Sequence, residues 1–93
     1  MDEPLPDAAP SLIEYPSAFP IKVMGAPVEG FEAAVVELAC RYDPAFDPAT
    51  VERRSSRAGN WLGLTITVTA TSRAQLDALY RALTAHPLVK VVL

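Results

Sequence analysis

The sequence predicts an α+β domain in which two helices cover one face of a four-stranded antiparallel sheet. Apolar and polar residues alternate along residues 61–70, as in a strand with one buried face. Two other segments carry apolar residues at helical spacing, and the predicted elements follow the order β-α-β-β-α-β. A length of 93 residues suits one such domain.

The first predicted strand covers Phe19 to Met24, where apolar residues occupy every second position. Gly25 ends this strand, and Pro27 suits the first turn of a helix because a missing N–H costs nothing there. We expect that helix over residues 27–42. Its apolar stripe consists of Phe31, Val35, Leu38 and Tyr42.

A hairpin is expected next, with a short strand over residues 50–55 and a turn over residues 57–60 that contains Gly59. The third strand, residues 61–70, has the clearest pattern in the chain. Its inward set is Leu62, Leu64, Ile66 and Val68, and its outward set is Gly63, Thr65, Thr67 and Thr69.

The second helix is predicted to begin at Ser72, whose hydroxyl can cap the amide of Gln75 while Gln75 reaches back. Its buried stripe is Leu76, Leu79, Tyr80 and Leu83, and His86-Pro87 ends it. The last strand covers residues 88–93, with Val89, Val91 and Leu93 expected inward and Leu88, Lys90 and Val92 outward. This order of elements is the signature of the ferredoxin-like βαββαβ fold.

Composition suggests where the domain lies within the chain. Prolines and acidic residues crowd the N-terminus, so we expect residues 1–16 to form a mobile tail and residues 17–93 to form a single domain. Cys40 is the lone cysteine, the N-terminus is acidic, and no apolar run approaches the ~20 residues that span a bilayer. These features predict a cytoplasmic protein that does not bind a membrane.

The charge pattern argues against general nucleic-acid binding, since the net charge is −3. Residues 1–47 hold nine of the eleven acidic side chains and only two of the eight basic ones. The basic residues gather after that point, above all as Arg53, Arg54 and Arg57. An anionic partner could therefore dock locally.

Catalytic machinery is not evident. His86 is the only histidine, and with Cys40 alone beside it no zinc ligand set can be assembled. No pair of carboxylates falls in an evident cleft, and Cys40 has no nearby imidazole base. We therefore expect a protein that is not an enzyme and needs no metal and no cofactor.

The sheet face away from the helices is the main candidate for function. It should present Lys22, Met24, Trp61, Thr65, Thr67, Thr69, Lys90 and Val92. One interpretation is a solvated face with incidental apolar residues. The other is a docking surface for a protein, or for a second copy in a weak homodimer. RNA is disfavoured, because the central strands lack the aromatic residues on which bases stack.

Two loops offer further candidates, each with a simpler interpretation. Arg53, Arg54 and Arg57 could clasp a phosphate or carboxylate, or could be solvated or paired with the acidic first helix. The loop Gly25-Ala26-Pro27 could expose amides to a small ligand, or could be only a tight turn.

Three segments resemble the YbeD-like family of small bacterial proteins. They are residues 12–25 with the run Phe19-Pro20-Ile21-Lys22-Val23-Met24-Gly25, residues 55–61 with Ser-Ser-Arg-Ala-Gly-Asn-Trp, and residues 88–93. The resemblance implies a βαββαβ fold like that of ligand-sensing ACT domains and an association with lipoate metabolism. It brings no catalytic residues.

The function expected from the sequence is a non-enzymatic regulatory or adaptor domain that binds a protein through the open sheet face and the 53–57 hairpin. The alternative is an ACT-like domain that senses a small ligand near Gly25 or at a dimer interface.

Overall fold

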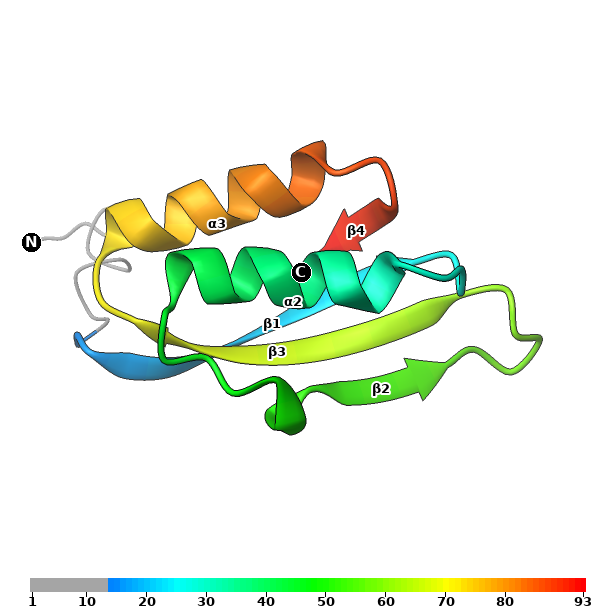
Figure 1. The fold of residues 1–93 in the computed structure, drawn as a ribbon, viewed down its shortest axis with the longest axis horizontal. Helices are drawn as coiled ribbons and strands as arrows, with labels where there is room; N and C mark the ends of the chain where they lie inside the picture. The colour runs from blue at the N-terminus through cyan, green and yellow to red at the C-terminus, as the bar shows by residue number, and fades with distance from the viewer. Residues whose placement is uncertain (1–13) are drawn as a thin grey trace, which may run out of the picture.

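Nine consecutive residue pairs join the two central strands, from Ser17 opposite Ala70 to Gly25 opposite Leu62. In the computed structural model, which describes residues 14–93, the other elements are arranged around this pair. Its elements, labelled as in Figure 1, are β1 (Ser17–Gly25), α2 (Phe31–Tyr42), the 3₁₀ turn η1 (Pro48–Thr50), β2 (Glu52–Ser55), β3 (Leu62–Ala70), α3 (Arg73–Ala85) and β4 (Val89–Val92).

The strand order across the sheet is β2-β3-β1-β4, and every neighbouring pair is antiparallel. Helices α2 and α3 run side by side in opposite directions along the sheet (Figure 1). The predicted ferredoxin-like α+β fold is therefore confirmed. Most of the predicted tail, residues 1–16, lies outside the described residues, and β1 begins at Ser17.

The core lies between the helices and one face of the sheet, as the alternation predicts. The fully buried residues of the central strands include Ile21, Val23, Leu64, Ile66 and Val68. The helices contribute Phe31, Val35, Leu38, Leu76, Leu79 and Leu83. Each such side chain contributes ~1.5–3 kcal/mol by leaving water, so these strands and helices stabilise one another.

The first helix begins four residues later than predicted. Gly30 precedes it with a φ of 91°, and the amide of Val28 bonds the carbonyl of Ala26 instead of continuing a helix. Pro27 therefore lies in the loop and not in the first turn. The left-handed backbone at Gly30 is a conformation that side-chain-bearing residues avoid, and it redirects the chain into α2.

Gly25 is needed at the end of β1 for a packing reason. A Cβ atom there would lie 2.4 Å from the carbonyl oxygen of Leu88 and 2.6 Å from Cε1 of Phe31. No side chain fits within those distances. The absence of a Cβ lets the start of β4 and the first residue of α2 close over β1.

The second strand is shorter than predicted, because η1 includes Thr50 and Val51 ends that turn. The Asp47 carboxylate accepts the amide of Ala49 at 3.0 Å, and Pro48 stands at the first position of this short helix. Thr50 closes the turn with its hydroxyl on the Asp47 carbonyl. Regular pairing with β3 therefore begins at Glu52.

The start of α3 agrees with the predicted cap, with one difference. The Ser72 hydroxyl accepts the Gln75 amide at 3.0 Å, as expected. The Gln75 side chain reaches back to the amide of Thr71 and not to that of Ser72. Its amide group also donates to the carbonyls of Tyr42 and Thr69, so one side chain ties together α2, β3 and α3.

Asp43, which directly follows α2, is the one buried charged residue among those described, with 5 % of its surface exposed. One carboxylate oxygen accepts the amide of Ala45 at 3.1 Å, and the other accepts the amide of Thr69 at 2.8 Å. The carboxylate therefore satisfies two backbone donors and fastens the end of α2 to β3.

The last strand corrects the prediction for its inward and outward residues. The partners of Met24 and Gly25 are Val91 and Val89, so Lys90 is an extra residue at a β-bulge. The bulge reverses the alternation that a regular strand would keep. Val92 therefore packs against the core, while Val91 and Leu93 are exposed.

Backbone bonds between Leu93 and Lys22 extend the pairing of β4 with β1 by one further residue. The Tyr80 hydroxyl of α3 lies 3.5 Å from the Leu93 carbonyl oxygen, which it faces as a donor. Burial raises the pKa of the Tyr80 phenol, since a phenolate would lose solvation there.

The Asp43 carboxylate generates a stability prediction. Asp43→Ala should lower the free energy of unfolding by about 2–3 kcal/mol, because it removes the acceptor of two partly buried backbone donors. Asp47→Ala is the matched control: it removes an exposed cap and should cost about 1 kcal/mol or less. Urea midpoints at unchanged m-values measure both. Equal losses for the two variants would contradict the role given to Asp43.

The close packing at Gly25 generates a second prediction. Gly25→Ala should destabilise the fold by about 1–3 kcal/mol, since backbone atoms must move to admit the methyl group. Gly63→Ala serves as control, because the nearest atom to its Cβ would be 3.5 Å away. Thermal unfolding of the two variants would reveal the difference, and a Gly25 variant as stable as the Gly63 variant would refute the packing argument.

Candidate functional site

The sheet face away from the helices is built from two rows of side chains that cross all four strands. Strand register places Thr65 beside Lys22 and Gly63 beside Met24 on the central strands. The edge strands complete the rows, since β2 pairs with β3 and β4 pairs with β1. The first row is Glu52, Thr65, Lys22 and Leu93, and the second is Arg54, Gly63, Met24 and Val91.

These rows surround a hollow of about 650 Å³, referred to below as the open-face hollow. Its lining comes from all three of the strands β1, β2 and β3, from the hairpin, and from the residue after β4. The lining residues are Lys22, Met24, Glu52, Arg53, Arg54, Ser55, Ser56, Trp61, Gly63, Leu64, Thr65 and Leu93.

Gly63 explains why the face is hollowed at this position. It stands in the middle of the second row, where its neighbours Arg54 and Met24 carry long side chains and it carries none. Trp61 lies two residues before Gly63, immediately before β3 begins, and lines the same hollow. The floor is therefore bare backbone, with larger side chains around it.

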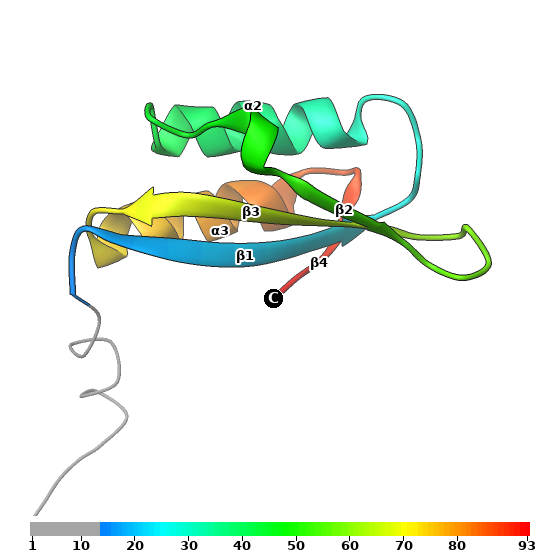
Figure 2. The same cartoon turned by 90° about the horizontal axis from the view of Figure 1, so that it is seen from below.

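The hairpin that carries Trp61 is held by its own hydrogen bonds. The amide of Ser56 donates to the Trp61 carbonyl at 2.9 Å, and the Trp61 amide donates to the Ser56 hydroxyl at 3.1 Å. Gly59, with a φ of 77°, closes the turn through a bond to the Ser56 carbonyl. The hairpin projects beyond the end of the other strands (Figure 2). Trp61 remains 42 % exposed on this fixed support.

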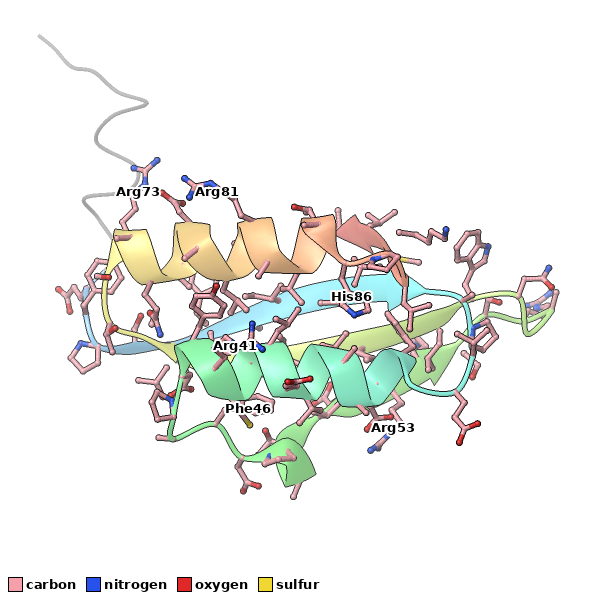
Figure 3. All side chains as sticks on the ribbon, turned by 45° about the horizontal axis from the view of Figure 1, so that its top comes forward. Arg41, Phe46, Arg53, Arg73, Arg81 and His86 are labelled. Carbon is pink, nitrogen blue, oxygen red and sulfur yellow. The ribbon has the colours of Figure 1, made fainter. Side chains whose placement is uncertain are left out.

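Arg53 and Arg54 face opposite sides of the sheet, because adjacent residues of a strand alternate. Arg53 pairs with Leu64 on the helix side, where its guanidinium makes two hydrogen bonds to the Glu32 carboxylate of α2. Figure 3 shows Arg53 beside that helix. The hydrogen bond and charge of Glu32 raise the pKa of Arg53. One arginine of the predicted cluster is thus an internal partner of the acidic helix.

Besides Arg53, the side chains that line the hollow include two cations, Lys22 and Arg54, and one carboxylate, Glu52. Within residues 14–93, neither cation takes part in an ion pair, whereas Arg41, Arg53 and Arg73 each have a carboxylate partner. The hollow is therefore locally basic on a chain of net charge −3.

Six of the nine partner-binding residues predicted from the sequence line the hollow: Lys22, Met24, Arg53, Arg54, Trp61 and Thr65. The other three lie elsewhere. Arg57 is exposed in the hairpin turn, Thr67 is exposed farther along β3, and Lys90 is exposed at the bulge on the opposite edge. Val92, which was expected on the open face, packs against the core instead.

The loop predicted to bind a small ligand, Gly25-Ala26-Pro27, does not adjoin a helix N-terminus. Helix α2 begins at Phe31, after Gly30. The Phe31 ring and the Leu88 carbonyl fill the space next to Gly25, which is buried. The observed contacts are those of a tight turn.

Sequence reasoning missed four lining residues: Glu52, Gly63, Leu64 and Leu93. Ser55 and Ser56 belong to the predicted 53–57 hairpin. Gly63 carried a usable signal, because a glycine inside a strand of β-branched residues marks a close approach or an irregularity. Leu93 could not be placed on this face without the bulge at Lys90.

His86 and Cys40 have local roles in the fold. The His86 ring accepts the Leu88 amide at Nδ1, 3.1 Å away. Cys40 is partly buried and packs against the core. Within residues 14–93, no group of three or more His, Cys, Asp or Glu side chains could hold a metal ion. Neither described helix is long and apolar enough to cross a membrane.

The solved structure of protein HP0495 from H. pylori resembles this chain in fold. The TM-score is 0.72, with 15 % identity over 87 % of this chain and 85 % of that one. Identity at this level supports the fold alone.

Other proteins are much more similar to this chain in sequence. A UPF0250 protein of Leptothrix cholodnii is 75 % identical over 83 residues, covering 89 % of this chain and 91 % of that protein. A UPF0250 protein of Ralstonia nicotianae is 59 % identical over 92 residues, covering 99 % and 95 %. A family model described as "Protein of unknown function (DUF493)" matches residues 10–93. The chain belongs to this family, in agreement with its YbeD-like sequence segments.

Proposed function

We propose that this protein is a non-enzymatic adaptor or regulatory domain that binds another protein through the open-face hollow. The observation that carries the proposal is the composition of the hollow. It combines Trp61 and Met24 with Arg54, and tryptophan, methionine and arginine are enriched in protein interfaces. Trp61 and Arg54 are also of the residue types that dominate binding energy.

The shape of the site supports a protein partner over a small molecule. Small-ligand sites enclose most of the surface of the ligand. Here the hollow lies open on an exposed sheet face, and the charged side chains Lys22, Arg54 and Glu52 border it. A protein surface can cover such a face without the deep enclosure that a small ligand needs.

Small-ligand sensing at the first loop has less support. A sensor with its ligand near Gly25 would need space that the Phe31 ring and the Leu88 carbonyl already occupy, and this contact does not bear on a ligand at a dimer interface. The link to lipoate metabolism rests on the family resemblance alone, and identification of the partner tests it.

Affinity capture from host-cell extract tests the proposal with two matched double variants. Trp61→Ala with Lys22→Glu should reduce recovery of the specific partner at least about tenfold, since it removes an aromatic anchor and reverses a charge in the hollow. Tyr15→Ala with Arg81→Glu makes the same two changes outside the hollow, and should keep wild-type recovery. Arg81 projects from α3 (Figure 3). Quantitative mass spectrometry provides the readout, and equal recovery by both double variants would refute the proposal.

A further inference from the structure

Gly63 is the one glycine of the chain's four whose presence the fold does not require. Gly30 and Gly59 have positive φ angles, which favour glycine, and Gly25 has no room for a side chain. Gly63 has neither constraint. A Cβ there would meet the Arg54 carbonyl oxygen at 3.5 Å and the Met24 Cγ at 3.9 Å, which are ordinary contact distances.

A glycine inside a strand weakens the strand, because it has no side chain to pack and more freedom to lose on folding. Strand β3 otherwise carries threonine, isoleucine, valine and leucine at its central positions, the residue types that strands favour. A side chain at residue 63 would occupy part of the open-face hollow, next to Arg54 and Met24. The missing side chain therefore leaves room for a group that approaches the sheet from outside.

The charges around Gly63 indicate what kind of group approaches. Arg54 is its direct neighbour on β2, and Lys22 lies in the adjoining row. Neither cation has an ion-pair partner within residues 14–93. Glu52 is the one acidic side chain of the lining, so the lining side chains complement an acidic partner.

Apolar groups stand beside these cations. Met24 flanks Gly63 on β1, Trp61 lines the hairpin side, and Leu93 lines the far side of the hollow. A fully acidic ligand would leave these groups uncovered. An extended segment, whose side chains alternate between two directions, can present acidic and apolar groups to such a surface.

We infer that the open-face hollow binds an acidic segment of a partner protein, with an apolar side chain over Gly63 between Met24 and Trp61 and carboxylates facing Lys22 and Arg54. This inference rests on the proposed function and gives it a partner chemistry. A longer side chain at residue 63 would exclude the apolar group, and reversal of the two cations would repel the carboxylates.

Two blocked six-residue peptides test the inference on the full chain. In the acidic peptide, glutamate alternates with leucine, and in the matched peptide each glutamate is replaced by glutamine. Backbone amide shifts and Trp61 fluorescence report binding. The acidic peptide should bind saturably by about 1 mM, shift residues 22–24, 52–56 and 61–65, and bind at least about tenfold more tightly than the glutamine peptide. Added salt should weaken the binding of the acidic peptide.

Three variants sharpen the test. Gly63→Val should weaken the acidic peptide at least about tenfold while thermal unfolding stays at or above the wild-type temperature. Lys22→Glu with Arg54→Glu should abolish its binding and create binding to a lysine–leucine peptide of the same length. Arg81→Glu, on the outer surface of α3, should leave the affinities for the acidic peptide and for the lysine–leucine peptide unchanged.

Several outcomes would overturn the inference: equal binding of the acidic and glutamine peptides, absence of shifts on the open face, or full affinity in Gly63→Val. Concentration-dependent self-association lost in Gly63→Val would assign the hollow to a second copy and would overturn it as well. The proposed function is tested separately, by the affinity capture described above. If the peptides do not bind but Trp61→Ala with Lys22→Glu still loses its captured partner, only the acidic-segment inference is wrong.

Discussion

The continuous pairing of β1 with β3 determines both faces of the sheet. Because the nine pairs run without a bulge, Ile21 and Val23 meet Ile66 and Leu64 on the helix side. The same register forces Lys22 and Met24 to the other side. A shift by one residue would exchange the two sets and bury a lysine. The core and the open-face hollow are thus two consequences of one register, and neither can change without the other.

Polar contacts at the end of the molecule opposite the hairpin keep the helices on their face. The Asp43 carboxylate and the Gln75 side chain join the end of α2, the end of β3 and the start of α3. On the other end, Arg53 crosses from β2 to Glu32 of α2. These ties use one arginine of the hairpin for the fold and leave Arg54 for the open face. Basic residues that are adjacent in sequence therefore have different roles.

Most of the fold could be predicted because its central strands and both helices carry strong periodic patterns. The misplaced features depend on backbone details that periodicity does not encode. Gly30 delays the first helix through its left-handed conformation, and the bulge at Lys90 turns Val92 inward. The hollow was predictable only in part. Alternation along β2 could have separated Arg53 from Arg54, but the room for a side chain at Gly63 depends on how Arg54 and Met24 pack around it in three dimensions.

In the proposed complex, a partner protein covers the open sheet face and not the helices. Cross-saturation NMR on the complex with the captured partner measures this directly, since signals fade only at protons near the partner. We expect loss at the Trp61 indole and at the methyl groups of Met24 and Leu93, with full signal at Ala74 and Thr84 on the exposed side of α3. Loss at Ala74 and Thr84, with Trp61 and Met24 unaffected, would contradict it.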